Sequence, residues 1–250
     1  MHKETFIYGI RPVIEGLKSG KEFEKVFLQK GIRGEGFHEL FNLLRDLEVP
    51  FQFVPVEKLN RLSRQNHQGV IGYVSEIVYQ RLEDLVPFVF EQGRNPLFLL
   101  LDRVTDVRNA GSIARTAECA GADGMVWPAQ GSAQINSDAI KTSAGALYKL
   151  PVVRSKNLKD SIRFLKDSGI TVIAATEKTD RPYTAADFTR PVALILGSEG
   201  EGISPEYLKL ADESVRIPLA GEIESLNVSV AAGILLFEVV RQRSQLSSPA

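Results

Sequence analysis

Cysteine and histidine are scarce in this chain of 250 residues, which has one cysteine and three histidines. A single cysteine excludes an internal disulfide framework and a zinc site built from several cysteines. Cys119 lies in a stretch that predicts a helix interior, where we expect a small buried residue and not a catalytic thiol. The histidines, His2, His38 and His67, are scattered, so the sequence predicts no metal site.

Long apolar runs and an excess of charge are also missing. The longest nearly apolar stretch, 228–237, is shorter than the roughly 20 residues that a membrane span needs. The N-terminus shows no secretory signal, so we expect a cytoplasmic protein without a membrane partner. The net charge is −1, and the first 80 residues hold 11 lysines and arginines against 10 acidic residues. Any positive surface for a nucleic acid must therefore arise from the folded arrangement or from a dimer.

Residues 1–76 predict a small α/β domain. Apolar residues recur at helical spacing over 37–47, and short apolar runs at 26–28, 51–54 and 69–74 predict strands. Shorter patterns predict a strand and a helix within 7–17 and a helix over 56–62. Residues 77–96 break this pattern with a short amphipathic helix near 82–90 and a turn at 93–96. We interpret 77–96 as a linker with a leading helix.

From residue 97 to 243, predicted strands and helices alternate. Buried strands are expected at 97–101, 125–127, 171–175, 192–196 and 214–217, and helices at 109–120, 158–167 and 228–243. Continuous apolar strands separated by helices favour a mostly parallel sheet covered on both faces, which is an α/β fold. Residues 244–250 remain as a tail.

Three motifs of glycines and small polar residues follow predicted strands. They are 105–115, 197–202, and 217–219 leading into 225–229. In open α/β folds ligands bind at such strand ends, where helix starts expose unpaired backbone groups.

The second motif reads Gly197-Ser198-Glu199-Gly200-Glu201-Gly202. Its glycines allow a sharp turn and a close approach to a ligand, although a purely structural turn fits the same residues. The motif lacks the lysine and Ser/Thr of a phosphate-binding loop. Its two glutamates would repel a phosphate, so an uncharged or cationic ligand fits better.

The other two motifs combine good helix caps with polar groups. Ser225 and Asn227 can cap the helix that follows, and packing by small residues could explain the rest of that motif. Asn109 and Arg115 lie at the start of a helix, where a structural interpretation is a cap at Asn109 and a surface arginine. Arg115 has small and apolar neighbours in sequence, where an unpaired charge would be costly. A polar cluster or an RNA phosphate would relieve that cost.

Together, the identity and order of the three motifs resemble the SpoU (TrmH-like) family of RNA ribose 2′-O-methyltransferases. The resemblance covers about 97–243 and departs at Val107, where the family usually has proline. The segments Tyr8-Gly9-Ile10 and Asn66-His67-Gln68-Gly69-Val70 also resemble the small substrate-binding domain of its ribosomal-RNA members. The chain is most similar to the RlmB-like members, which act on a guanosine of 23S ribosomal RNA.

This resemblance implies a catalytic domain with a deep C-terminal trefoil knot, a homodimer, and S-adenosyl-L-methionine as cofactor. The residues it places at the cofactor are Thr176, Gly197, Ile217, Pro218 and Leu226. The residues it places at the reaction are Asn109, Arg115, Glu199, Ser225 and Asn227. It implies no metal.

The implied reaction is methyl transfer to a ribose 2′-hydroxyl of structured RNA, with large-subunit ribosomal RNA as the expected substrate and tRNA as the alternative. Arg115 corresponds to the family's candidate base, but an arginine pKa above about 12 makes phosphate binding or alkoxide stabilisation an equal alternative. Two further alternatives stay open: an RNA-binding protein without catalysis, and a nucleotide-dependent enzyme that uses 197–202 as a phosphate loop.

Overall fold

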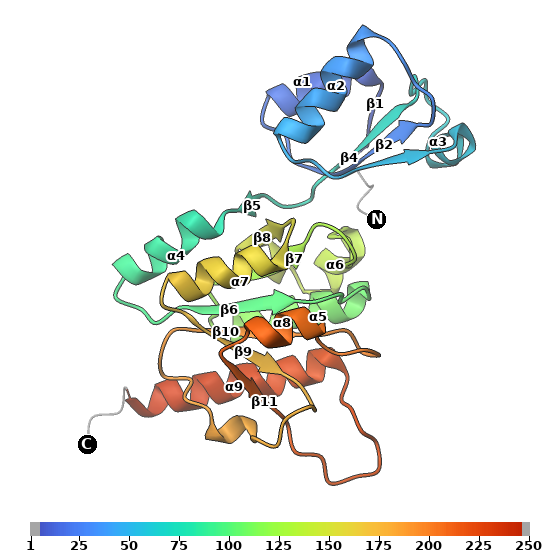
Figure 1. The fold of residues 1–250 in the computed structure, drawn as a ribbon. Coiled ribbons are helices and arrows are strands. Elements are labelled where there is room, and N and C mark those ends of the chain that lie inside the picture. The colour runs from blue at the N-terminus through green and yellow to red at the C-terminus, as the bar shows by residue number, and fades with distance from the viewer. Residues whose placement is uncertain (1–5, 247–250) are drawn as a thin grey trace. The chain divides into compact units, whose positions relative to one another are not determined.

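The computed structural model describes residues 6–246, which fold as two compact units (Figure 1). Unit 1 comprises the described residues up to Val78 together with Ile135–Ser137. Unit 2 comprises Tyr79–Gln134 and the described residues from Asp138 onward.

Unit 1 is built on a four-stranded sheet in the order β1-β4-β2-β3. Strand β4 runs antiparallel to β1 and β2, whereas β2 and β3 are parallel. The strands are β1 (Phe6–Tyr8), β2 (Phe23–Gln29), β3 (Phe51–Val54) and β4 (Val70–Val74), and the helices are α1 (Ile10–Lys18), α2 (Glu35–Asp46) and α3 (Val56–Leu62).

Each face of this sheet has its own apolar core, because side chains alternate between faces along a strand. On one face Val26 and Leu28 pack with α1 and α2, which contribute Val13, Leu40 and Leu44 among others. On the other face Phe27 and Ile71 pack with Leu59 of α3. Unit 1 therefore has the cores that a small domain needs to fold.

Unit 2 is built on a seven-stranded sheet in the order β11-β9-β10-β6-β7-β8-β5, and every neighbouring pair is parallel. Its strands are β5 (Tyr79–Gln80), β6 (Leu97–Leu101), β7 (Gly124–Pro128), β8 (Val152–Ser155), β9 (Thr171–Ala175), β10 (Val192–Leu196) and β11 (Glu213–Val215). Its helices are α4 (Leu82–Glu91), α5 (Val107–Cys119), α6 (Ser137–Thr142), α7 (Leu158–Asp167), α8 (Pro205–Leu210) and α9 (Val228–Leu246), with 3₁₀ turns at Ala146–Tyr148 and Tyr183–Ala185.

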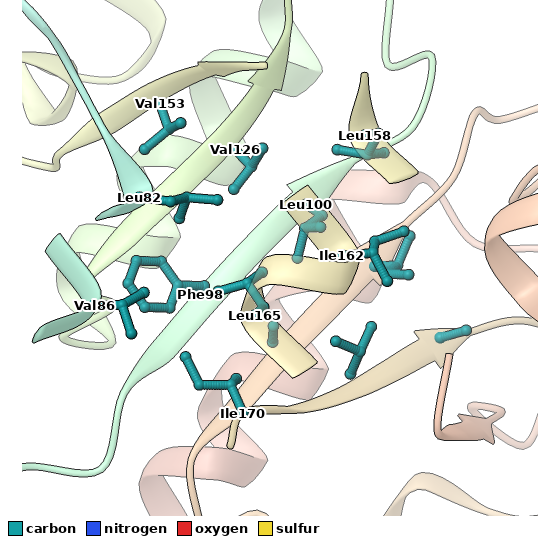
Figure 2. Packing of buried hydrophobic residues seen from close by; sticks show 14 of the residues in the cluster. Leu82, Val86, Phe98, Leu100, Val126, Val153, Leu158, Ile162, Leu165 and Ile170 are labelled. Atoms are coloured by element: carbon teal, nitrogen blue, oxygen red, sulfur yellow. The ribbon is translucent and has the colours of Figure 1, made fainter. Parts of the chain in front are cut away.

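One core of unit 2 lies between the sheet and helices α4 and α7. Figure 2 shows Phe98 and Leu100 of β6 packed against Ile162 and Leu165 of α7, with Val86 of α4 beside them. The alternate β6 residues Leu97, Leu99 and Leu101 are also buried. Both faces of the central strand are therefore covered, which explains why its sequence is continuously apolar.

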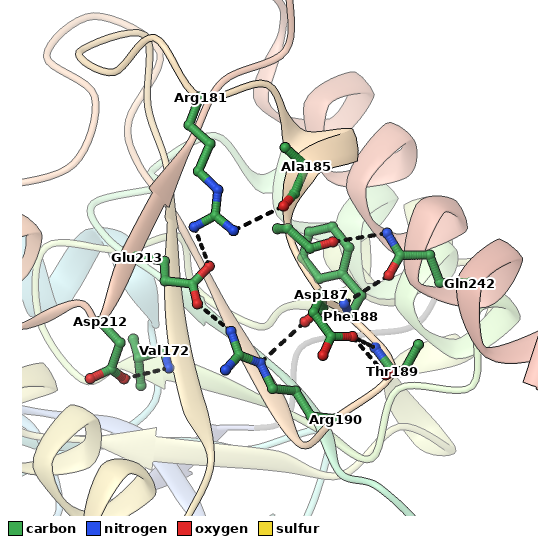
Figure 3. Close-up of polar contacts among 11 residues, drawn as sticks. Val172, Arg181, Ala185, Asp187, Phe188, Thr189, Arg190, Asp212, Glu213 and Gln242 are labelled. Carbon is green, nitrogen blue, oxygen red and sulfur yellow. Dashed lines mark hydrogen bonds and ion pairs between the residues drawn. The ribbon is translucent and has the colours of Figure 1, made fainter.

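The connection between β9 and β10 is held by two later elements, as Figure 3 shows. Glu213 of β11 accepts a hydrogen bond from Arg181 at 2.5 Å and also pairs with Arg190. Gln242 of α9 donates to the Ala186 carbonyl at 3.0 Å and accepts from the Phe188 amide at 2.8 Å. Segment 181–190 is thereby fastened to β11 and to the far half of α9.

The α/β class and the parallel sheet predicted from the sequence are confirmed. The predicted bounds of β3, α3 and α7 are those of the structure, whereas β11 is shorter than predicted and α5 begins two residues earlier. The sequence patterns did not predict β5, β8, α6 or α8. Among residues 6–246, no helix combines the length and apolar character needed to cross a membrane.

Candidate active site

The three motifs lie at one edge of the sheet in unit 2. Strands β11, β9, β10 and β6 are consecutive neighbours and parallel, so their carboxyl ends meet at the same edge. The first motif follows β6, the second follows β10 and the third follows β11. The topology therefore brings together segments that are more than a hundred residues apart in sequence.

The first motif is positioned by Asp106, which caps α5. Its carboxylate accepts hydrogen bonds from the amides of Arg108 at 2.8 Å and Asn109 at 2.9 Å. The structural interpretation that placed the cap at Asn109 is therefore wrong. Because Asp106 satisfies the helix start, the Asn109 side chain in the first turn is available for other contacts.

Asn109, Glu199 and Asn227 form one hydrogen-bonded cluster. The Asn109 amide nitrogen donates to Glu199 Oε1 at 2.8 Å, and the Asn227 amide nitrogen donates to the same oxygen at 2.6 Å. Asn227 also lies 2.9 Å from Asn109 Oδ1. Each of the three motifs thus contributes one side chain, and the two amides hold a single carboxylate in place.

Asn227 has a second task at the start of α9. Its Oδ1 accepts hydrogen bonds from the Ser229 amide at 2.9 Å and the Ser229 hydroxyl at 2.5 Å. The cap predicted for Asn227 is therefore confirmed. Since its oxygen is fixed by the cap, its amide nitrogen must point at Glu199 and Asn109.

The loop that carries Glu199 is a tight hairpin. Ser198 and Gly202 exchange backbone hydrogen bonds of 3.2 and 3.1 Å. A Cβ on Gly197 would lie 2.2 Å from the Gly202 carbonyl carbon, a separation that no side chain can occupy. The loop's own backbone therefore fills the space next to Gly197. Glycine is needed here for the hairpin itself.

Asp102 and Arg103 anchor this loop to the end of β6. The buried Asp102 carboxylate accepts hydrogen bonds from the Ser204 amide at 2.6 Å and the Ser204 hydroxyl at 2.7 Å. Arg103 donates to Asp102 at 3.2 Å and to the Gly202 carbonyl at 3.1 Å, and it pairs with Glu201. The hydrogen bond to Asp102 is the main cause that raises the pKa of Arg103, which stays charged.

The sequence motifs did not predict the anchoring role of Asp102, Arg103 and Ser204. Asp102 directly follows the predicted strand 97–101. An available signal was a charged pair placed directly after a buried strand, since such residues need partners. Arg103 also has a φ of +55°, a conformation that non-glycine residues seldom adopt and that no sequence pattern indicated.

Arg115 lies on the exposed face of α5, away from the core. The buried stripe of this helix is formed by Ala110, Ile113, Ala114 and Ala117. Arg115 and Cys119 lie one turn apart outside that stripe and are both exposed. We expected Cys119 to be buried and Arg115 to lie among apolar residues, and both expectations are wrong. Within residues 6–246 the Arg115 guanidinium has no hydrogen bond or ion pair, so it can bind an anion.

The other candidate residues surround the same strand ends. Thr176 directly follows β9 and is buried, and its amide donates to the Val215 carbonyl at 2.9 Å. Ile217, Pro218, Ser225 and Leu226 lie on the exposed segment between β11 and α9, where Ile217 is half-buried. In the described part of the chain the Ser225 hydroxyl makes no hydrogen bond. The structure therefore does not bring Ser225 into the cluster of Asn109, Glu199 and Asn227.

Two carboxylates that have no cationic partner among the described residues lie near the hairpin. Glu199 lies on it, and a Cβ on Gly202 would lie 3.8 Å from a carboxylate oxygen of Glu177, whereas Glu201 is paired with Arg103. The exposed apolar side chains Leu219 and Leu226 lie on the neighbouring segment. Carboxylates beside an apolar surface suit a ligand with both a positive centre and an aromatic ring. Within residues 6–246 no three histidine, cysteine or acidic side chains gather to hold a metal ion.

Comparison with known proteins gives matches over both units. Residues 96–237 match the SpoU rRNA methylase family, and residues 6–80 match the RNA 2′-O ribose methyltransferase substrate-binding domain. A Bacillus subtilis (strain 168) protein named in the TrmH family of tRNA/rRNA methyltransferases, YacO, is 34% identical over 243 residues, or 97% of each chain.

Two solved structures extend this similarity. The SpoU methyltransferase AviRb from Streptomyces viridochromogenes, in complex with the cofactor AdoMet, is 27% identical with a TM-score of 0.61, covering 97% of this chain and 91% of that one. An AdoMet-bound rRNA methyltransferase from Sinorhizobium meliloti is also 27% identical with a TM-score of 0.61, covering 94% of this chain and 86% of that one.

Proposed function

The chain belongs to the SpoU rRNA methylase family, and on that premise we propose that it transfers a methyl group from S-adenosylmethionine to a ribose 2′-hydroxyl of RNA. The single observation that carries this proposal is the hydrogen-bonded cluster of Asn109, Glu199 and Asn227. It joins one polar side chain from each family motif at the ligand-binding edge of the sheet.

We propose that Thr176, Gly197, Ile217, Pro218 and Leu226 hold the cofactor. When bound, S-adenosylmethionine supplies an electrophilic methyl group on a positively charged sulfur. The carboxylates Glu177 and Glu199 favour such a positive centre. Ile217, Pro218 and Leu226 offer apolar surface for the adenine ring. Gly197 acts indirectly, since it permits the hairpin that positions Glu199.

We propose that Arg115 binds the phosphate beside the target ribose and stabilises negative charge on its 2′-oxygen. A guanidinium holds its proton too tightly to be an effective base at neutral pH, but its planar fork matches a phosphate. Asn109, Glu199, Asn227 and Ser225 orient the ribose. With the cofactor bound, the 2′-oxygen would need to approach the methyl carbon to about 3–3.5 Å. The C–O bond would form as the C–S bond breaks, and the hydroxyl proton would pass to solvent water.

The proposed substrate is a guanosine of 23S ribosomal RNA, with tRNA as the alternative. The description of the family as rRNA methylases and the rRNA methyltransferase from Sinorhizobium meliloti favour ribosomal RNA. The Bacillus subtilis relative is named for both RNA types. A protein that only binds RNA is a weaker alternative, because it would not need the Asn109–Glu199–Asn227 cluster.

We also propose a homodimer and a C-terminal trefoil knot. Val230 and Phe237 of α9 lie two turns apart and are each about half exposed, and Ile223 and Leu226 are exposed in the preceding segment. Exposed apolar side chains of this kind favour an interface with a second copy. The knot is proposed from membership of the family.

The test combines cofactor binding with methyl transfer. Titration calorimetry should give binding of S-adenosylmethionine and no binding of ATP. With labelled cofactor, the purified protein should methylate a 23S ribosomal RNA transcript more efficiently than a tRNA mixture. Binding of ATP alone would favour a phosphate loop at 197–202. RNA binding without methyl transfer to any RNA would favour the non-catalytic alternative.

A further inference from the structure

Positive charge in unit 1 is concentrated in three segments. We define the basic end as loop 29–34, helix α3 and loop 63–69. It carries five cations and one carboxylate, whereas the remaining residues of 6–78 carry five cations and eight carboxylates. The cations of the basic end are Lys30, Arg33, Lys58, Arg61 and Arg64, and its carboxylate is Glu57. The near-neutral composition of this unit therefore hides a local excess of positive charge.

The three segments of the basic end are neighbours in space. The Lys30 amide donates to the Val54 carbonyl at 2.9 Å, directly before α3, and the Gln29 amide donates to the Gly69 carbonyl at 2.8 Å. A Cβ on Gly69 would lie 2.9 Å from the Ile32 side chain. The ends of β2 and β3 and the beginning of β4 thus present these cations together.

The cations of the basic end are exposed and are not neutralised within the described residues. None of the five forms an ion pair there, and Lys58 lies over the Phe27 ring at 5.2 Å from its centroid. Elsewhere in unit 1, Arg11 and Lys18 both pair with Glu39. A group of unpaired like charges is a binding surface for a polyanion, because an anionic partner relieves their repulsion.

A fixed turn adds neutral polar groups to this surface. The buried His67 ring hydrogen-bonds Asn60 Oδ1 at 2.9 Å and accepts from the Gly69 amide at 3.0 Å. The next residue, Gln68, has a φ of +48° and is exposed, with its side chain near Gly9. Its amide can donate to and accept from the edge of an unstacked base, as in recognition of RNA loops.

We propose that the basic end of unit 1 is the surface through which this unit binds RNA, and this rests on the proposed function. Lys30, Arg33, Arg61 and Arg64 contact phosphates, and Gln68 contacts an unpaired nucleotide. His67 is a positioning residue, because its buried ring bonds Asn60 and the Gly69 amide and so fixes the turn that carries Gln68. The expected partner is a loop or bulge of structured RNA, since a regular helix hides its base edges.

The experiment measures RNA binding by the full chain with a 23S ribosomal RNA transcript as the probe. The test variant is R61A/R64A, and the matched control is K21A/R45A, which removes two exposed cations of unit 1 outside the basic end. The test variant should bind about tenfold or more weakly at 0.1 M salt. Its slope of log affinity against log salt should fall by about 1.5, since each lost phosphate contact contributes roughly 0.7–0.9. The control should change little.

Measurements of methyl transfer and of cofactor binding distinguish a failure of the proposed RNA surface from a failure of the proposed function. In R61A/R64A the KM for RNA should rise while kcat at saturating RNA and the affinity for S-adenosylmethionine stay unchanged. Equal losses in test and control variants, or no loss in either, would overturn the proposed surface. If RNA binding depends on the basic end but the wild type methylates no RNA, the surface stands and the proposed function fails.

Gln68 is tested by Gln68→Gly and Gln68→Ala. Glycine relieves the unusual backbone conformation, so a purely structural role predicts unchanged or improved RNA binding by this variant. We expect both variants to weaken RNA binding several-fold with an unchanged salt slope, because the lost contact is uncharged. Wild-type affinity in a folded Gln68→Gly variant would remove Gln68 from the surface.

Discussion

At the scale of single residues, the exposed guanidinium of Arg115 is the proposed phosphate-binding group. It lies six residues beyond Asn109 on α5, outside the buried stripe. We expect Arg115→Ala to lower methyl transfer at least about a hundredfold, which is typical when a group that stabilises developing charge is removed. Cofactor affinity should stay within a few-fold, because the proposed cofactor residues follow other strands.

Arg115→Lys should also be poor, because a point charge cannot replace a planar fork at a phosphate. Single-turnover methyl transfer and calorimetry on the same preparations check both variants. Near-normal turnover by Arg115→Ala would contradict the proposed role. A strong loss of cofactor binding would place Arg115 at the cofactor instead.

One substitution of Asn227 separates its role as the cap of α9 from its hydrogen bond to Glu199. Asn227→Asp keeps an oxygen that can cap α9, but it removes the amide that donates to Glu199 and adds a second carboxylate there. We expect a thermal midpoint close to that of the wild type and at least about a tenfold loss of methyl transfer.

Asn157→Asp is the matched control for this variant, because Asn157 caps α7 through the same kind of bond. It should leave methyl transfer unchanged. If Asn227→Asp is fully active, the hydrogen bonds between Asn227 and Glu199 have no part in the reaction.

At the scale of elements, Asp102 anchors the hairpin 198–202 through Ser204 and Arg103. The Asp102 carboxylate accepts three hydrogen bonds, and an amide at this position could not accept all of them. We expect Asp102→Asn to reduce the free energy of unfolding by about 1–3 kcal/mol. It should also lower kcat well below the unfolding temperature, with little change in the KM for RNA.

Ser204→Ala should shift kcat in the same direction by a smaller amount, since the Ser204 amide bond to Asp102 remains. Steady-state kinetics and thermal unfolding on the same samples provide the measurement. A variant that loses stability but keeps its kcat would show that Asp102 supports the fold alone.

The sequence indicates elements well where a pattern repeats over enough residues. Helix α7 has a clear apolar stripe and β10 is continuously apolar, so both could be predicted. Helices α6 and α8 have six residues each, too few for a period to emerge, and β5 has two. Element type is therefore predictable only above a certain length.

The candidate site shows a similar division. The strand ends that carry Asn109, Glu199 and Asn227 could be predicted, because parallel strands bring their carboxyl ends together. The anchoring by Asp102 could not be predicted, since its partner Ser204 lies about a hundred residues away in sequence. The packing of Gly197 against Gly202 could not be predicted either, because it is a contact between loop backbones. Arg115 was misjudged because its sequence neighbours point to the other side of the helix.

At the scale of the whole molecule, the two units are proposed to divide the work. All residues of the proposed reaction site belong to unit 2, whereas the basic end belongs to unit 1. We expect a fragment of residues 79–250, which keeps β5 paired with β8, to fold, dimerise and bind S-adenosylmethionine. It should lose most activity on ribosomal RNA because it lacks the phosphate-binding surface.

The fragment and the full chain are compared in oligomeric state by sedimentation, in cofactor affinity by calorimetry, and in methyl transfer to ribosomal RNA. Equal efficiency on the same nucleotide would show that unit 1 does not recognise the substrate. A monomeric fragment and a dimeric full chain would instead place the dimer contact in unit 1, away from α9.

The central claim is that this chain methylates a ribose 2′-hydroxyl of large-subunit ribosomal RNA through Arg115 and the cluster of Asn109, Glu199 and Asn227. The most direct measurement maps 2′-O-methylated nucleotides in total RNA from a strain that lacks the gene, complemented with the wild type or with Arg115→Ala. We predict that one methylated guanosine of 23S ribosomal RNA is lost, is restored by the wild type, and is not restored by Arg115→Ala. An unchanged map of ribosomal and transfer RNA in the deletion strain would contradict the claim.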